Sequence, residues 1–133
     1  MTVNTQQLPT TATFEKHLWT WQGYKIQYTV LGTGKPLVLV HGFGACIGHW
    51  RKNIPVLADA GYRVFALDLL GFGGSEKAPI DYTVEVWVEL LKDFWIAHIN
   101  QPAVFIGNSI GALLSLMVLA EHPEIVAGGV LIN

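Results

Sequence analysis

The stretch that decides the fold is AVFIGNSIGALLSLMVLAE, residues 103–121. Its first four residues are an apolar run of the kind found in a strand that is buried on both faces. Residues 112–121 are apolar and helix-forming, and Pro123 ends that helix. Between them, GNSIG at 107–111 supplies a sharp turn. The sequence therefore predicts a strand, a tight corner and a helix in direct succession.

The corner matches the pattern Gly-x-Ser-x-Gly, with Gly107, Ser109 and Gly111 at the fixed positions. Between a strand and a helix, this pattern holds a serine in a strained conformation with its hydroxyl exposed, and the glycines avoid collisions. The N–H of Ile110, at the positive end of the helix dipole, is able to donate to an oxyanion. We expect Ser109 to be a nucleophile, Ile110 a backbone oxyanion donor and Asn108 a supporting residue. The alternative is a plain turn in which Ser109 only caps the helix.

Similar apolar runs alternate with helical patterns along the rest of the chain. We expect buried strands at 36–40 and 62–67 and another beginning at Val130, and helices at 49–60 and from Thr83 to His98. The first helix contains Pro55, so it must be kinked or start later. Two further strands, at 19–20 and 24–30, precede this series. The predicted fold class is α/β, a mostly parallel sheet with an N-terminal antiparallel hairpin and helices on both faces.

A second turn is expected beside the corner at 107–111. Ligand sites in parallel sheets lie outside the carboxyl ends of the strands, and His41-Gly42-Phe43-Gly44 directly follows the strand at 36–40. We expect the N–H of Phe43 to be the second oxyanion donor, with His41, Gly42 and Gly44 shaping its loop. Two such donors are worth about 3 kcal/mol each in a site shielded from water.

Three motifs, taken together, resemble the α/β-hydrolase superfamily: HGFG at 41–44, DLLGFGGS at 68–75 and GNSIG at 107–111. The resemblance spans about residues 19–133 and, around 49–53 and 105–111, is nearest to plant and cyanobacterial members related to pheophytinase. It implies an ester or related acyl substrate, with Ser109 as nucleophile, and a structural role for Asp68 in bracing the loop that follows it. Relatives that open epoxides or remove halogens carry aspartate at the nucleophile position, so serine argues against both chemistries.

The resemblance also implies a lid, further strands and a catalytic acid and histidine beyond Val130, and these are not among the 133 residues. We expect residues 1–13 to be a polar leader and 14–133 to be the N-terminal portion of the core domain. His122 is too far along its helix to reach Ser109, about 20 Å at 1.5 Å per residue. His17 and His98 are expected at the far edge, whereas His41 and His49 are expected to position loops and line the pocket. The chain alone should therefore turn over substrate poorly.

Composition excludes several other classes. Apolar residues make up 51% and charged residues 14%, and the scattered Lys and Arg with a net charge of −2 give no footprint for nucleic acid. No run reaches the length of a membrane span, and residues 1–13 lack a secretory signal, so a cytoplasmic protein is expected. One cysteine excludes an internal disulfide, and we expect neither a cofactor nor a metal.

Two rival interpretations remain open. A dinucleotide-binding oxidoreductase would use Gly42-x-Gly44 and Asp68, but its third glycine would stand where Ile47 does. A truncated, non-catalytic half would keep the scaffold only. In that case the last strand would be an exposed apolar edge, through which copies of the chain would associate.

Overall fold

The computed structural model describes residues 14–133, and the expected leader at 1–13 lies outside the described residues. The elements in chain order are β1 (His17–Trp21), β2 (Tyr24–Leu31), β3 (Lys35–Val40), the 3₁₀ helix η2 (Ile47–Trp50), α1 (Asn53–Asp59), β4 (Tyr62–Leu67), α2 (Val84–His98), β5 (Ala103–Asn108), α3 (Ile110–Glu121) and β6 (Val126–Ile132). Strands alternate with helices from β3 onward, as the sequence predicts.

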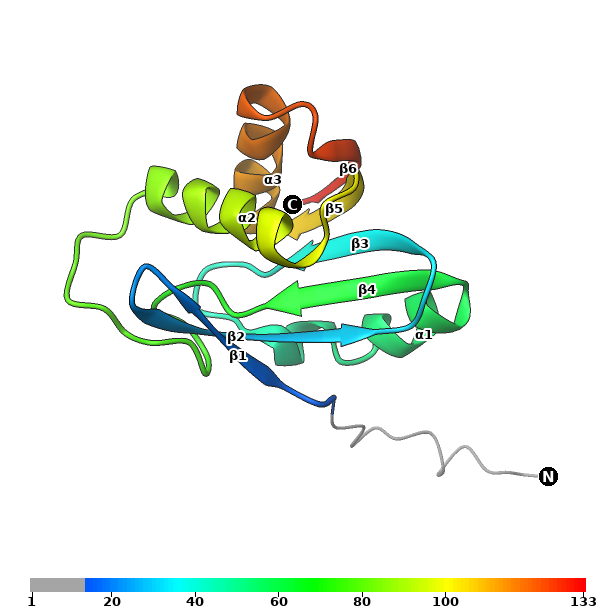
Figure 1. Cartoon of the computed structure of the whole chain (residues 1–133), viewed down its shortest axis with the longest axis horizontal. Coiled ribbons are helices and arrows are strands. Elements are labelled where there is room, and N and C mark those ends of the chain that lie inside the picture. The colour runs from blue at the N-terminus through cyan, green and yellow to red at the C-terminus, as the bar shows by residue number, and fades with distance from the viewer. Residues whose placement is uncertain (1–13) are drawn as a thin grey trace.

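The six strands form one sheet in the order β1-β2-β4-β3-β5-β6 (Figure 1). The β1–β2 hairpin is antiparallel and β2 also pairs antiparallel with β4, while the pairs β3–β4, β3–β5 and β5–β6 are parallel. The predicted fold class is confirmed. Val40 at the end of β3 lies opposite Leu67 of β4 and Gly107 of β5. The loops after these three strands therefore leave the sheet at one edge, side by side.

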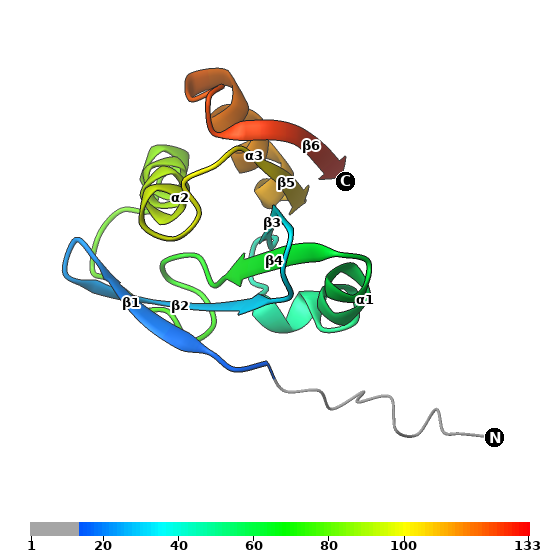
Figure 2. The same cartoon turned by 45° about the vertical axis from the view of Figure 1, so that its right-hand side comes forward.

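Helices cover both faces of the sheet, with α2 and α3 on one side and α1 on the other (Figure 2). Alternate residues of β3 and β4 divide between two apolar cores: Val38 and Phe65 face α2 and α3, whereas Leu39 and Ala66 face η2 and α1. All four are at most 1% exposed. Burying a large apolar side chain contributes about 1.5–3 kcal/mol, so a strand buried on both faces reads as a continuous apolar run.

Several element boundaries differ from the prediction. The helix expected at 49–60 is η2 followed by α1, and Pro55 lies in the first turn of α1, where a missing N–H costs no helical hydrogen bond. The strand expected from Val130 starts at Val126. The predicted start is late because the glycines at 128 and 129 interrupt the apolar pattern of the strand. α3 starts at Ile110, so the corner is a single residue.

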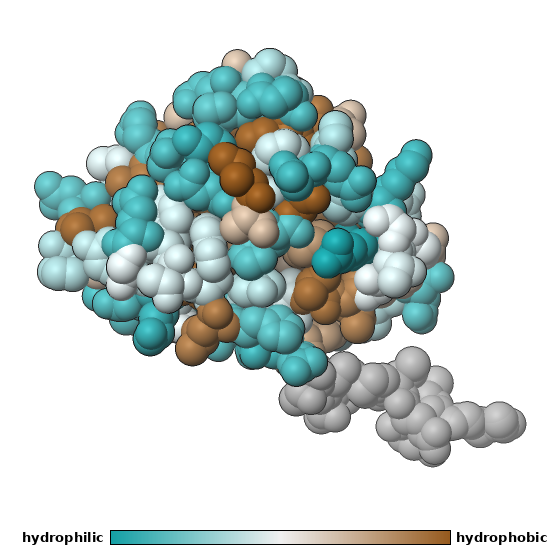
Figure 3. Space-filling model, in the orientation of Figure 1, coloured by the Kyte–Doolittle hydropathy of each residue, from teal (hydrophilic) through white to brown (hydrophobic). Residues whose placement is uncertain are grey.

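The surface shown in Figure 3 is mostly hydrophilic, with apolar side chains gathered in separate patches. Among residues 14–133, no helix has the length and apolar character needed to cross a membrane. The buried strands and the apolar α3 account for the high hydrophobic content of the chain.

Candidate active site

Ser109 is the corner between β5 and α3, and its backbone is strained. Its φ of 60° and ψ of −123° are outside the regions that a residue with a side chain ordinarily occupies. Its N–H donates to the carbonyl of Ile132 on β6 at 2.9 Å, which fixes the corner against the neighbouring strand. The side chain is exposed and makes no capping hydrogen bond to α3. A plain N-cap would use extended backbone and such a bond, so the capping alternative does not describe this residue.

Neither glycine of the corner, Gly107 or Gly111, has room for a side chain. A Cβ on Gly107 would overlap the carbonyl oxygen of Gly111, and a Cβ on Gly111 would overlap the carbonyl oxygen of Val40. The N-terminus of α3 therefore packs directly on the backbone of β5 and on the end of β3. The collisions expected from the sequence pattern involve these particular backbone atoms.

The loop after β3 lies against Ser109. A Cβ built on Gly42 would be 3.2 Å from Cβ of Ser109. The loop turns at Gly44, which has a φ of +76°, and the N–H of Ala45 donates to the carbonyl of Gly42 at 3.1 Å. Phe43, between the two glycines, has a 73% exposed side chain whose ring packs edge-on against Phe72 at 5.3 Å. The two loops that carry the expected oxyanion donors are thus neighbours in space.

The N–H of Ile110 belongs to the first turn of α3. The first four N–H groups of a helix have no partner within that helix, and the helix dipole places partial positive charge there. Ser109 immediately precedes this turn, so an oxygen atom near its hydroxyl would be close to these donors.

Asp68 is 1% exposed, and its carboxylate accepts three hydrogen bonds from three separate segments. The N–H of Ile47 donates to Oδ1 at 2.7 Å, and the N–H of Gly74 and the amide of Gln27 donate to Oδ2 at 2.9 and 3.0 Å. These bonds connect η2, the glycine-rich loop and β2. Gln27 and Ile47 could not be predicted as partners from the sequence, since each lies at least 21 residues away in the chain.

The Asp68 geometry also bears on the dinucleotide alternative. A ribose-binding acid needs free carboxylate oxygens, whereas both oxygens of Asp68 already accept from protein donors. Gly42, which would have to face a pyrophosphate, faces Ser109 instead. These contacts disfavour a dinucleotide site.

The five histidines fall into two groups. His41 and His49 lie near Ser109: Nε2 of His49 is 3.5 Å from the side-chain nitrogen of Asn108, and His41 is fully buried beneath the loop. The other three histidines lie elsewhere. His17 packs against Tyr28, His98 lies in an aromatic cluster, and His122 lies beside Glu124. Among the described residues no hydrogen bond joins the Ser109 hydroxyl to a histidine ring.

Burial lowers the pKa of His41, and this effect outweighs its hydrogen bond to Gly42 and the nearby charge of Asp68, both of which raise the pKa. Its ring is therefore neutral at neutral pH. Burial also lowers the pKa of His98, which packs against Trp19, Tyr28 and Phe94.

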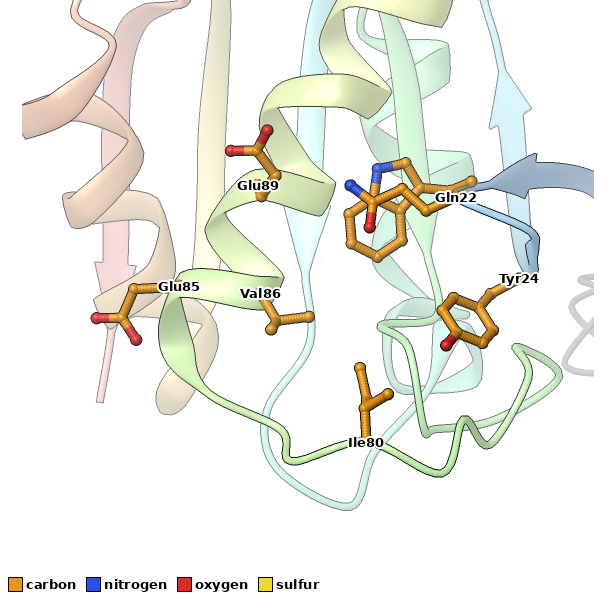
Figure 4. Close-up of a pocket in the computed structure, with 7 residues that line it drawn as sticks. Gln22, Tyr24, Ile80, Glu85, Val86 and Glu89 are labelled. Atoms are coloured by element: carbon orange, nitrogen blue, oxygen red, sulfur yellow. The ribbon is translucent and has the colours of Figure 1, made fainter.

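Two pockets of the described residues have room for a small molecule. One of about 250 Å³ starts at Ser109 and continues along apolar side chains of α3 and β6: Ala112, Leu113, Leu116, Leu131 and Ile132, with Asn133 at the end. Another of about 260 Å³ lies between the β1–β2 turn and α2, and Figure 4 shows that the carboxylates of Glu85 and Glu89 point away from Ile80 and Tyr24. Of these two pockets, only the first is lined by Ser109. Within residues 14–133 no group of three His, Cys, Asp or Glu side chains could hold a metal ion.

Comparison with known proteins agrees with this fold. Residues 35–133 match a family model described as alpha/beta hydrolase fold. The chain is 40% identical over 115 residues to a 2-hydroxy-6-oxo-6-(2'-aminophenyl)hexa-2,4-dienoic acid hydrolase of Metapseudomonas resinovorans, covering 84% of this chain and 39% of that protein. It is 35% identical over 106 residues to bifunctional epoxide hydrolase 2 of Rattus norvegicus, covering 77% of this chain and 19% of that protein. The chain thus spans well under half the length of these relatives.

Solved structures give the same result for the fold. The crystal structure of a serine hydrolase involved in carbazole degradation superposes with a TM-score of 0.81 at 35% identity, covering 90% of this chain and 47% of that one. The epoxide hydrolase VrEH1 of Vigna radiata superposes with a TM-score of 0.86 at 24% identity, covering 90% of this chain and 40% of that one.

Proposed function

Because this chain belongs to the alpha/beta hydrolase fold family, we propose that it is the nucleophile-bearing part of a serine hydrolase acting on an ester or related acyl substrate. The observation that carries the proposal is the strained, exposed Ser109 between the Gly42–Gly44 turn and the first turn of α3. The closer assignment to pheophytinase-like members stays a prediction.

In the proposed reaction, Oγ of Ser109 attacks the carbonyl carbon of the substrate and passes its proton to a base. The carbonyl oxygen becomes negative and accepts hydrogen bonds from the N–H groups of Phe43 and Ile110. Each such donor, held in place before the reaction, accelerates acyl transfer by about 100-fold or more. The leaving group then takes a proton, and water hydrolyses the acyl-enzyme to regenerate Ser109.

The other residues named from the sequence support this geometry in the proposal. Gly107 and Gly111 allow α3 to approach β5 and β3, and Gly42 and Gly44 allow the loop to approach Ser109. His41 and Asn108 hold the loop after β3 and the corner in position, Asp68 braces the glycine-rich loop that follows it, and none of the three contacts the substrate.

A second candidate is a non-catalytic half of a hydrolase, and one observation favours it. A serine hydroxyl is a weak nucleophile without an adjacent base, and no histidine of the described residues is hydrogen-bonded to Ser109.

A fluorophosphonate probe distinguishes the two candidates on the 133-residue chain. Active-serine chemistry predicts covalent labelling of the wild type that disappears in Ser109→Ala. Ser115→Ala is the matched control, since Ser115 is buried and its hydroxyl donates to the carbonyl of Gly111 at 2.8 Å. Labelling that persists in Ser109→Ala would contradict the proposal, and absence of any labelling would favour the non-catalytic half.

A further inference from the structure

His41 is a buried polar residue that the reaction outlined above does not use directly. It lies immediately after β3 with no exposed surface, and its ring packs edge-on against Phe72 at 5.6 Å. Its two ring nitrogens have separate partners. Nδ1 is 2.7 Å from the carbonyl oxygen of Gly42, and Nε2 is 3.0 Å from the N–H of Leu69 in the loop after β4.

These partners allow one protonation state of the ring. The N–H of Leu69 is only a donor, so Nε2 must present a lone pair. The carbonyl of Gly42 is only an acceptor, so Nδ1 must carry the proton. The neutral Nδ1–H tautomer satisfies both contacts. The other tautomer would place two donors face to face at Leu69 and two acceptors face to face at Gly42.

The hydrogen bond to Gly42 fixes the direction of the next N–H. The carbonyl of Gly42 and the N–H of Phe43 belong to one planar trans peptide, so they point in opposite directions. This carbonyl accepts from His41 on its buried side and also from the N–H of Ala45. A carbonyl held toward the buried ring leaves the N–H of Phe43 directed away from it, out of the core. A rotated peptide would present an oxygen where an oxyanion needs a donor.

We infer that His41 is a positioning residue whose Nδ1–H tautomer sets the orientation of the Gly42–Phe43 peptide and so prepares the oxyanion donor. The inference rests on the proposed function, because the direction of the Phe43 N–H matters for catalysis only if Ser109 attacks a carbonyl group. It also makes the loop sensitive to acid. A doubly protonated ring would face the N–H of Leu69 with a second donor and lose that contact.

The groups around His41 agree with a neutral ring under ordinary conditions. Burial and, more weakly, His49 from η2 lower the pKa of His41, whereas the hydrogen bond to Gly42 and the charge of Asp68, from the loop after β4, raise it. Phe72 covers the ring with an aromatic edge that offers no hydrogen-bond acceptor. Burial therefore opposes the second protonation of the His41 ring, which requires acidic pH.

Two substitutions separate the contacts of the ring. His41→Asn keeps a donor near the position of Nδ1 and loses the acceptor for Leu69. His41→Gln keeps an acceptor near the position of Nε2 and loses the donor to Gly42. If His41 only filled space, Gln, whose volume is closer to that of His, would be tolerated better. If the bond to Gly42 positions the loop, Asn is the better replacement.

The first measurement is nuclear magnetic resonance on the ¹⁵N-labelled 133-residue chain and does not depend on activity. We expect the His41 ring to be the Nδ1–H tautomer at neutral pH, and the Phe43 amide resonance to move much more in His41→Gln than in His41→Asn. An Nε2–H tautomer, or a Phe43 amide that is unchanged in His41→Gln, would overturn the inference. If His41→Gln does not fold, the wild type carries the test, since the Phe43 amide must titrate together with the His41 ring. His98→Phe removes the half-buried His98, the other histidine whose pKa burial lowers, as a control.

The second measurement is the rate of fluorophosphonate labelling at Ser109. Loss of one oriented oxyanion donor predicts labelling about 100-fold slower in His41→Gln, and a smaller reduction in His41→Asn. Equal rates in the two folded variants would overturn the inference. If the wild type is not labelled, the proposed function fails for this chain, and the Phe43 amide alone decides the role of His41.

Discussion

Replacing Asp68 with Asn tests how η2, the glycine-rich loop and β2 are held together. The carboxylate accepts from the N–H groups of Ile47 and Gly74 and from the amide of Gln27. An Asn amide offers one oxygen and one NH₂ group. It keeps the bond from Ile47 and, after rotation of the Gln27 amide, one contact with Gln27. The N–H of Gly74 then faces a donor.

The magnitude follows from these three bonds. One donor left without a partner in a partly buried place costs about 1–3 kcal/mol, and replacing the other two charge-assisted hydrogen bonds by bonds between neutral groups costs roughly another 1 kcal/mol. We therefore expect Asp68→Asn to lower the free energy of unfolding by about 2–4 kcal/mol. With a typical urea dependence, the unfolding midpoint would fall by roughly 1–2 M.

Urea unfolding monitored by circular dichroism and tryptophan fluorescence measures this loss. Asp81→Asn is the matched control, because Asp81 is an exposed loop residue and its substitution should change stability by at most about 0.5 kcal/mol. A loss below about 1 kcal/mol for Asp68→Asn, or equal losses in the two variants, would refute the reasoning that Asp68 connects η2, the glycine-rich loop and β2.

Three further outcomes are expected. Gly111→Ala should abolish cooperative unfolding or lower stability by about 3 kcal/mol or more, because the added Cβ overlaps the backbone of β3. Gly128→Ala should be tolerated, because its added Cβ would be 3.9 Å from the nearest atom, in the side chain of Val104. Equal thermal midpoints of the two variants would contradict this reasoning. Stability should decrease as the pH falls below 6.5, because burial lowers the pKa of His41 and His98 in the folded chain and the unfolded chain therefore takes up protons first. The loss of stability should stop growing below the folded-state pKa values of the two rings. A His98→Phe variant with an unchanged acid profile would exclude a contribution from that ring. Leu131→Lys should reduce self-association of the 133-residue chain through β6, where Leu131 is 50% exposed, and analytical ultracentrifugation that finds only monomers of the wild type would contradict the proposed association.

Much of the fold could be predicted because local composition and long-range packing agree. Residues 36–40 and 103–106 are continuous apolar runs, and in the sheet they lie side by side with helices on both faces. The least accurate boundaries are those where local signals conflict with packing. Gly128 and Gly129 lower the strand propensity of β6, and pairing with β5 overrides it.

In the candidate site, the features marked by local sequence signals were predictable, and the partners from distant segments were not. The pattern around Ser109 and the HGFG turn are local signals, because glycines at fixed spacing indicate a strained corner and a close approach of backbones. The partners of Asp68 and His41 were not predictable. Their donors are mostly backbone N–H groups, which every residue type supplies, so no letter of the sequence marks Ile47, Leu69 or Gly74 as a partner.

The sequence by itself determined the alternation of strands and helices and the sharp turn at 107–111 that carries Ser109, because periodicity, proline and glycine act through neighbouring residues. Only the tertiary structure decided which groups meet at the edge of the sheet. Parallel pairing in register brings the ends of β3, β4 and β5 together. That registry places Gly42 beside Ser109 and puts the N–H of Leu69 within reach of the His41 ring, so the orientation of the loop is set by contacts between segments that are far apart in the chain.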